Sequence, residues 1–312
     1  MSDSAVSFEP YRRRLLGLAY RMLASMADAE DAVQDAYLRW HGADRAAVKE
    51  PRAFLMTTTT RICLDMLTSA RARREEYVGQ WLPEPVLDTA SLGPDSRTAL
   101  AEDLSIALLL TLDRLSPLER AAFLLHDVFD CSFAEVASVL GRSAAACRQL
   151  ATRARAHVRA ERPPGAATQR PRAASHDTDH AQLVSAFAAT IQSGDVEALR
   201  QLLARDVRVV TDGGGKVRAA VNPVDGADRA ARFLIDVTRP RPDAWWQDTF
   251  TVRHGLVNGL PGLIVGGPHG PMQTTAFEIE NNVIRAIYVV RNPDKLRHLA
   301  TPPRERVSGP ES

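Results

Sequence analysis

Apolar residues recur every three or four positions in the first part of the chain, which predicts amphipathic helices. One run comprises Leu15, Leu18, Ala19, Met22 and Met26. Two later runs comprise Val33, Ala36, Tyr37 and Trp40, and then Leu55, Thr59, Ile62 and Met66. We expect the second helix to start after Asp28 as its N-cap. The third should start near Pro51, because proline is favoured in a first helical turn.

Prolines and a glycine interrupt this pattern between Val78 and about Asp103, which indicates that this segment is a linker. Helical spacing resumes from Leu104. Two capping boxes follow, Ser116 with Glu119 and Ser132 with Glu135, and each predicts the start of a helix. A stretch rich in proline, alanine and arginine from Arg162 to Ser175 predicts a second, flexible linker.

The pattern changes after this second linker. Two helices are expected, at about Asp179–Gln192 and Val196–Ala204. Short runs of β-forming residues follow, separated by turn residues: Val207–Thr211, Val217–Val221, Leu263–Val265, Thr274–Ile279 and Val283–Val290. Helices followed by a run of strands predict an α+β domain. The chain as a whole is therefore expected to hold two all-α domains and then one α+β domain.

Composition is that of a globular protein, with 45% apolar and 25% charged residues among 312. Apolar stretches of about 18 residues are missing, and Met1–Arg14 lacks the apolar core of a signal peptide. We therefore expect a cytoplasmic protein that does not enter a membrane. Cys63, Cys131 and Cys147 are far apart in helical patterns and are expected to be reduced, packed thiols.

The net charge is only +1, but the charges are unevenly distributed. Arginines gather at Arg71–Arg74 and again between Arg142 and Arg162, whereas acidic residues gather at Asp28–Asp35. Two basic segments and one acidic segment indicate two kinds of macromolecular partner.

The segment Ser132–Arg159 has the plan of a helix-turn-helix. Gly141 can take the left-handed conformation that ends the first helix, and Ser143 can cap the second. The second helix would then present five polar side chains to a DNA major groove: Arg148, Gln149, Thr152, Arg153 and Arg155. An ordinary helical hairpin with a solvated basic face has the same pattern, so this motif alone leaves both interpretations open.

Two segments of the first helical block favour nucleic-acid and protein contacts. Asp31, Gln34, Asp35 and Leu38 share one face of the helix Glu30–Trp40, a face that suits either solvent or a basic protein partner. The segment Arg52–Arg74 joins an apolar helix to a basic end, near Tyr77 and Trp81. Arginines beside aromatic rings suit a separated DNA strand, although a core helix with a basic end is an equally good interpretation.

In this order, these segments resemble the extracytoplasmic-function sigma factors of bacterial RNA polymerase, over about Tyr11–Leu299. AEDAVQDAYLRW (Ala29–Trp40) is similar to the helix that binds the clamp of the polymerase β′ subunit. PRAFLMTTTTRICLDMLTSARARR (Pro51–Arg74) is similar to the helix that melts and reads the −10 promoter element. SFAEVASVLGRSAAACRQLATRARAHV (Ser132–Val158) is similar to the helix-turn-helix that reads the −35 element.

The resemblance implies residue roles at matching positions. Core polymerase would be bound by Glu30, Asp31, Gln34, Asp35 and Leu38. The −10 element would be contacted by Arg61, Asp65, Arg71, Arg73 and Arg74. The −35 element would be contacted by Arg142, Ser143, Arg148, Gln149, Thr152, Arg153 and Arg155.

The third domain resembles that of a subgroup whose C-terminal extension is SnoaL-like, of the NTF2-like fold. The match rests on WLPEP (Trp81, Leu82, Pro83, Glu84, Pro85), DGGGK (Asp212, Gly213, Gly214, Gly215, Lys216) and NPDKL (Asn292, Pro293, Asp294, Lys295, Leu296). In that subgroup the extension regulates the sigma factor in cis. The resemblance therefore implies contacts between these three motifs, and no separate anti-sigma protein.

The domain boundaries expected from these comparisons are 1–77 and 104–162 for the helical domains 2 and 4 and 176–301 for the extension, with linkers 78–103 and 163–175 and a tail from 302. SnoaL-like folds include enzymes, but nothing in the spacing selects a base among Asp212, Asp248 and His254. We expect no catalytic residue, metal or cofactor. A small ligand in the third domain stays open, as does the alternative of a ligand-responsive helix-turn-helix regulator.

Overall fold

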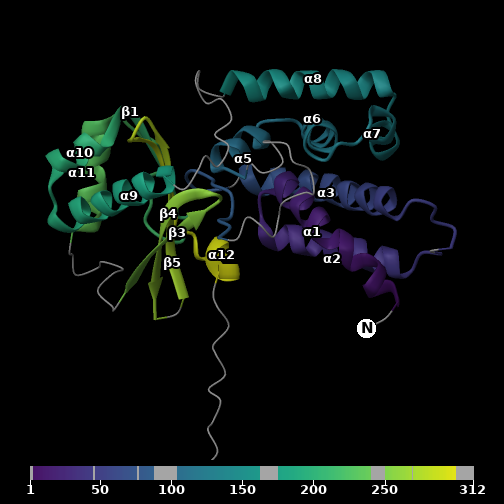
Figure 1. Cartoon of the computed structure of the whole chain (residues 1–312), viewed down its shortest axis with the longest axis horizontal. Helices are drawn as coiled ribbons and strands as arrows, with labels where there is room; N and C mark the ends of the chain where they lie inside the picture. Colours follow the sequence, from purple (N-terminus) through teal and green to yellow (C-terminus); the bar gives the residue numbers. More distant parts are fainter. Residues whose placement is uncertain are drawn as a thin grey trace, which may run out of the picture.

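The computed structural model describes residues 3–44, 46–75, 77–87, 104–161, 175–239, 250–268 and 270–299. Within these, the side chains of residues 3–6, 69–75, 161 and 175–178 lie outside the description. Two groups of helices lie on one side of the molecule, and an α+β domain lies on the other (Figure 1). In the described residues no helix is long and apolar enough to span a membrane.

The first helical group consists of α1 (Asp3–Leu23), α2 (Met26–His41) and α3 (Pro51–Glu75). Proline at the start of α3 agrees with the sequence. The N-cap of α2 is Ser25 rather than the predicted Asp28. Ser25 Oγ accepts a hydrogen bond from the backbone N–H of Asp28 at 3.1 Å, so Asp28 lies inside the first turn as a favourable negative charge.

The second helical group consists of α5 (Ile106–Asp113), α6 (Pro117–Phe123), a π-helical turn η2 (Leu124–Val128), α7 (Phe133–Leu140) and α8 (Ala144–Glu161). Both predicted capping boxes are present, at Ser116 and Ser132. Gly141 ends α7 with φ 61° and ψ 39°, the left-handed conformation that the sequence predicts. The helix-turn-helix geometry is therefore confirmed.

The two helical groups share one hydrophobic core, which runs from α1 to α8 without interruption. Buried arginines on both sides of the contact donate to backbone carbonyls across it: Arg14 to Phe129 O and Arg120 to Met22 O, each at 2.5 Å. In Figure 1, α6 and α7 lie between α8 and α3. The helix-turn-helix is consequently packed against α3 in this arrangement.

The α+β domain begins with α9 (Ser175–Ser193) and α10 (Val196–Leu202). Its strands are β1 (Leu203–Asp212), β2 (Val224–Asp225), β3 (Thr251–Val257), β4 (Leu260–Gly267), β5 (Gly270–Glu280) and β6 (Val283–Val290). They form a sheet in the order β2-β1-β6-β5-β4-β3, in which only the β1–β6 pair is parallel. Between β2 and β3 lies α11 (Ala227–Thr238), and α12 (Pro293–Leu296) and a 3₁₀ turn (Arg297–Leu299) follow β6.

Each face of this sheet is covered by a different part of the chain. Because side chains alternate along a strand, Val209 and Ile287 face α9, α10 and α11, whereas Val210 and Tyr288 face the other way. The second face packs against apolar side chains from outside the domain, among them Leu82 and Ile106. The linker after α3 and the start of α5 therefore complete the core of the C-terminal domain.

Three parts of this domain differ from the prediction. The expected strand Val217–Val221 is irregular, because Ala220 bonds through its backbone N–H to the Thr211 side chain instead of to a ladder. Helix α11 was not predicted, although its buried residues Ala230, Ala231, Leu234 and Ile235 recur at helical spacing. Strand β3 was also not predicted, because it is a sheet edge on which residues 251–256 are all exposed and no alternation is visible.

Both predicted linkers lie partly outside the described residues. The first, 78–103, is described up to Leu87, and the second, 163–175, is described only at Ser175, where α9 begins. The three cysteines are free and buried, as the sequence predicts.

Candidate functional site

The acidic face of α2 is fully open to solvent. Its five residues predicted to bind polymerase are all exposed: Glu30, Asp31, Gln34, Asp35 and Leu38. Ala32, Val33 and Ala36, on the opposite side of the helix, are buried. Leu38 is 57% exposed and shares this face of the helix with Asp31 and Asp35. The structure thus leaves an acidic surface with one apolar residue available to a partner.

The predicted −10 helix, α3, is partly covered by the helix-turn-helix. Arg61 donates through Nε to Val139 O and through Nη2 to Ser138 O, both at 3.2 Å. These carbonyls belong to the last turn of α7, where no helical N–H reaches them, so the guanidinium acts as a C-terminal cap. Asp65 is exposed, while the side chains of Arg71, Arg73 and Arg74 lie outside the described residues.

Helix α8 presents its polar face away from the rest of the protein. Cys147, Ala151 and Ala154 point inward and are fully buried. Of the residues predicted to contact the −35 element, Arg155 is half-buried. The others are exposed: Arg142, Ser143, Arg148, Gln149, Thr152 and Arg153. Ser143 Oγ accepts from Ala146 N–H and caps the helix, as the sequence predicts.

Several of these arginines already have partners inside the protein. Arg153 pairs with Glu119 at 2.8 Å, and Arg155 pairs with Asp127 at 2.7 Å. The guanidinium of Arg148 lies 5.6 Å from the ring centroid of Phe133. Because Arg155 is the least exposed and is ion-paired, Arg148 and Gln149 are better placed to meet DNA without rearrangement.

The linker is held by a carboxylate at the end of β1. Asp212 is completely buried, and the Tyr77 hydroxyl donates to its Oδ1. The backbone N–H of Leu82 donates to its Oδ2 at 2.8 Å, and the ammonium group of Lys295 reaches the same oxygen at 2.8 Å. Gly214 N–H donates to Oδ1 at 3.0 Å. One carboxylate therefore joins the linker, the glycine turn and α12.

Lys295 is the second half of this connection. Its ammonium also donates to Leu82 O and lies 4.3 Å from the ring centroid of Trp81 and 4.9 Å from that of Tyr77. A desolvated cation between two aromatic faces is stabilised by both rings. Sequence reasoning considered Tyr77 and Trp81 as surfaces for stacking bases. In the described structure these rings instead contact a lysine of the C-terminal domain.

The glycines of the DGGGK motif are required by close approach. A Cβ on Gly213 would lie 2.3 Å from Val217 O, and one on Gly214 would lie 2.2 Å from the amide of Asn292. At Gly215, which has φ +69°, a Cβ would meet Val78 of the linker at 3.1 Å. Because glycine has no Cβ, each of these positions allows a different segment to pack closely against the turn.

Residues of NPDKL contact Tyr77, the linker and the glycine turn. Asn292 caps α12 by accepting from Asp294 N–H, and its Nδ2 donates to the Tyr77 hydroxyl at 2.8 Å. Lys216 of the glycine turn forms an exposed ion pair with Asp294. Leu296 is buried beside Leu82, and Pro293 starts the helix. The structure thus brings together the WLPEP, DGGGK and NPDKL motifs.

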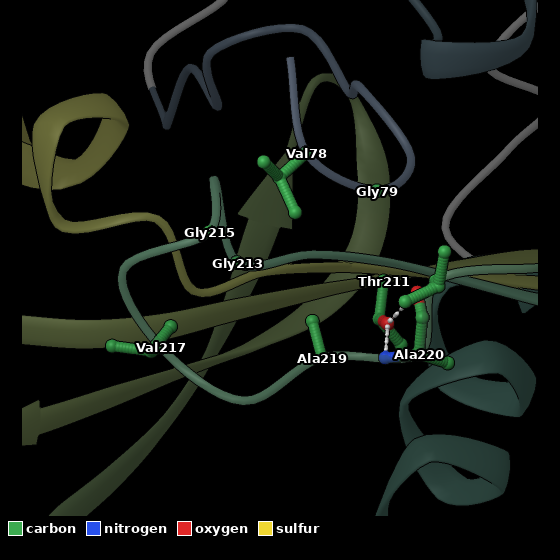
Figure 2. Close-up of a pocket in the computed structure, with 9 residues that line it drawn as sticks. Val78, Gly79, Thr211, Gly213, Gly215, Val217, Ala219 and Ala220 are labelled. Atoms are coloured by element: carbon green, nitrogen blue, oxygen red, sulfur yellow. Dashed lines mark hydrogen bonds between the residues drawn. The ribbon is translucent and has the colours of Figure 1, made fainter.

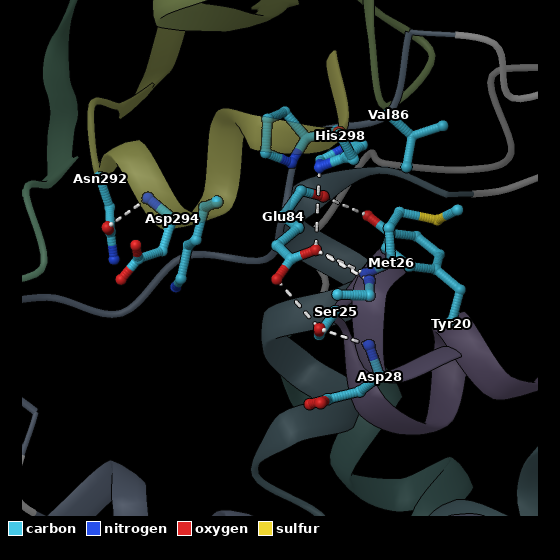
Figure 3. Close-up of polar contacts among 12 residues, drawn as sticks. Tyr20, Ser25, Met26, Asp28, Glu84, Val86, Asn292, Asp294 and His298 are labelled. Atoms are coloured by element: carbon cyan, nitrogen blue, oxygen red, sulfur yellow. Dashed lines mark hydrogen bonds and ion pairs between the residues drawn. The ribbon is translucent and has the colours of Figure 1, made fainter. Parts of the chain in front are cut away.

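The linker also reaches α2 through Glu84 (Figure 3). The Glu84 carboxylate accepts from Ser25 Oγ at 2.9 Å and from the backbone N–H groups of Met26 at 2.7 Å and Ala27 at 3.3 Å. These N–H groups are unpaired donors of the first turn of α2, where a negative charge is favoured. Within the same WLPEP motif, Pro85 O lies 2.8 Å from His298 Nε2, and Pro83 is buried.

A small cavity lies where the linker crosses the C-terminal domain (Figure 2). Its volume is about 50 Å³, and residues of the linker (Val78, Gly79) and of the glycine turn (Gly213, Gly215) line it. Ligand pockets commonly measure ~300–1,000 Å³. This cavity therefore does not support the small ligand that the sequence left open.

Two contact residues escaped sequence reasoning. Asn258, in the turn between β3 and β4, is 1% exposed and donates to the Tyr20 hydroxyl of α1 at 2.7 Å. Asn258-Gly259 is a strong hairpin signal, but a turn signal does not tell which distant segment the turn will touch. Tyr20 lies on an apolar helix face and looks like any core aromatic residue.

Known protein families match both helical groups. Residues 8–73 match the family described as Sigma-70 region 2, and residues 105–158 match Sigma-70, region 4. The chain is 39% identical to the ECF RNA polymerase sigma factor SigJ of Mycobacterium tuberculosis, over 97% of this chain and 96% of that protein. It is 30% identical to the probable ECF RNA polymerase sigma factor SigI of the same organism, over 94% of each chain.

A solved structure has the same overall fold. The crystal structure of Mycobacterium tuberculosis SigJ superposes with a TM-score of 0.69 and 35% sequence identity, covering 94% of this chain and 98% of that one. The predicted fold class, two helical domains followed by an α+β domain, is thereby confirmed.

Replacing Lys295 by Met should release the linker, because it leaves the buried Asp212 carboxylate without its cation. Breaking one partner of a buried pair costs ~3–5 kcal/mol. We expect faster proteolysis of residues 77–87 and a lower free energy of unfolding in urea. Lys216→Met is the matched control, since its exposed pair should contribute only ~0–1 kcal/mol. Equal effects of the two substitutions would contradict the assignment of Lys295 as the linker's anchor.

Proposed function

The chain belongs to the extracytoplasmic-function sigma factors, proteins that direct promoter-specific transcription initiation, and we propose that it does so with three separate surfaces. The acidic face of α2 binds core RNA polymerase through its β′ clamp. Helix α8 reads the −35 element in the major groove, with Arg148 and Gln149 as its first contacts. Helix α3 reads the −10 element, with Arg61 and Asp65 among the contacts. The exposure of Asp31, Asp35 and Leu38 supports the first of these roles.

The described arrangement is a closed form that cannot read both promoter elements at once. Elements at −35 and −10 lie roughly 25 base pairs apart, which is roughly 85 Å at 3.4 Å per base pair. Helices α3 and α7 are in direct contact, and Arg61 is bonded to α7. Domain 4 must therefore leave domain 2 before both elements can be bound. In the closed form α8 and the acidic face of α2 stay accessible, while part of α3 does not.

The C-terminal domain holds this closed form and so regulates the sigma factor in cis. It grips the linker through Asp212 and Lys295 and packs on Ile106 at the start of α5. Contacts that stabilise only the closed form lower the fraction of active molecules. This built-in restraint acts in place of a separate anti-sigma protein. The single observation that carries the proposal is the packing of the −10 helix against the helix-turn-helix.

A catalytic role for the C-terminal domain is not part of the proposal. Asp212, a candidate base, is bonded to Tyr77, Leu82, Gly214 and Lys295, so its lone pairs are already used. His254 lies on the exposed strand β3, and Asp248 lies outside the described residues. A polymerase-docking face on α2 also has no use in a ligand-responsive repressor.

Charge reversal of the α2 face should weaken binding to core polymerase. Asp31→Lys with Asp35→Lys removes attraction to a basic partner, so affinity and its dependence on salt should both fall. Both residues are exposed, and the fold should persist. Glu9→Lys with Asp228→Lys makes the same change in net charge elsewhere on the surface. The docking assignment fails if the two double variants bind core polymerase equally well.

Removing Arg148 tests the reading face of α8. Arg148→Ala should cost ~1–3 kcal/mol in promoter binding if the side chain contacts a base, with relaxed preference at one position of the −35 element. A phosphate contact would instead weaken all sequences alike and reduce the salt slope by about one. Binding titrations at several salt concentrations separate the two. Unchanged binding to every sequence would mean that α8 meets DNA through another face.

Weakening the grip on the linker should raise transcription. Trp81→Ala removes one aromatic face from Lys295, and deletion from Asn292 removes Lys295 itself. A decrease of ~1.4 kcal/mol in the free-energy difference between the closed and open forms changes the ratio of open to closed molecules tenfold. Promoter-specific transcription by core polymerase should rise at equal concentrations of folded sigma factor. Identical output from both variants and the intact chain would remove the case for regulation in cis.

A further inference from the structure

A tight hairpin turn of the C-terminal domain lies at the meeting point of all three parts of the chain. Val257 pairs with Leu260, so Asn258 and Gly259 form a two-residue turn between β3 and β4. Both have positive φ, 53° and 75°, as a type I′ turn requires. Turns of this kind are usually solvated, yet Asn258 is 1% exposed.

Asn258 bonds to three segments that are distant in sequence. Its backbone N–H donates to Val86 O at 2.7 Å, and its Oδ1 accepts from Val86 N–H at 3.1 Å. Asn258 thus binds both polar backbone groups of Val86. Its Nδ2 donates to the Tyr20 hydroxyl at 2.7 Å and to Leu104 O at 3.3 Å. The linker, α1 and the residue before the N-cap of α5 thus meet on one side chain.

Tyr20 extends this junction back to the linker. Its hydroxyl accepts from Asn258 and donates to Glu84 O at 2.7 Å, and Glu84 in turn caps α2. Tyr20 is fully buried, so a hydroxyl deprived of these partners would stay unsatisfied. The chain of bonds runs from the β3–β4 turn through α1 to the first turn of the polymerase-docking helix.

We propose that Asn258 is a positioning residue that fixes the closed form by joining the C-terminal domain to both helical domains at once. The proposal rests on the cis regulation proposed above and adds a contact that is independent of Asp212 and Lys295.

A second asparagine turn in the same domain separates this role from turn formation. Asn281 and Asn282 connect β5 to β6, also with positive φ, of 51° and 60°, and both are exposed. The hairpin conformation therefore needs neither burial nor an amide bonded to other domains. Glycine adopts positive φ freely, so Asn258→Gly keeps the turn and removes only the side-chain bonds. Asn281→Gly is the matched control.

The test is backbone hydrogen exchange at Leu82 and Glu84 in the full chain, because Asn258 does not touch either amide and both are bonded in the closed form. Asn258→Gly should speed exchange at both about tenfold, equivalent to ~1.4 kcal/mol, and raise promoter-specific transcription. Tyr20→Phe, which keeps the ring, should act in the same direction. Asn281→Gly should change neither measurement.

The outcomes separate this inference from the proposed function. If exchange in Asn258→Gly and Tyr20→Phe matches that of Asn281→Gly, the positioning role is overturned, even where Lys295→Met still opens the linker. If Asn258→Gly speeds exchange but transcription does not rise, the positioning role stands and regulation in cis is contradicted.

Discussion

The buried ion pair between Asp212 and Lys295 is the contact on which the arrangement of the linker depends. Both side chains belong to the C-terminal domain, but apart from Gly214 their partners are Tyr77, at the end of domain 2, and Trp81 and Leu82 of the linker. A buried carboxylate is tolerated only while its charge and lone pairs are matched. The Asp212 carboxylate therefore has all these bonds only with the linker in place, and the linker gains a fixed path across the domain.

From this path the positions of the other domains follow. Glu84 meets the first turn of α2, Leu82 and Ile106 cover the outer face of the sheet, and Leu104 lies on the β3–β4 turn. The two helical groups then share a core in which α3 packs on α7. This arrangement leaves the acidic face of α2 open to solvent and covers part of α3.

Local features were readable from the sequence, and distant pairings were not. The capping boxes at Ser116 and Ser132 and the left-handed Gly141 depend on neighbours within four residues, and all are present. The resemblance indicated that WLPEP, DGGGK and NPDKL would meet, but the pairing of Asp212 with Lys295, 83 residues apart, has no local signal. Arg61 shows the same limit: the resemblance implied a contact with DNA, and in the closed form Arg61 caps α7.

The central claim is that domain 4 separates from domain 2 before promoter recognition. Single-molecule energy transfer between dyes on Thr68→Cys in α3 and Ala156→Cys in α8 tests it most directly. Both positions are exposed, and the native cysteines are buried. We predict high transfer in the free protein and its loss in the polymerase–promoter complex, where the elements lie roughly 85 Å apart. High transfer retained in a transcribing complex would contradict the account.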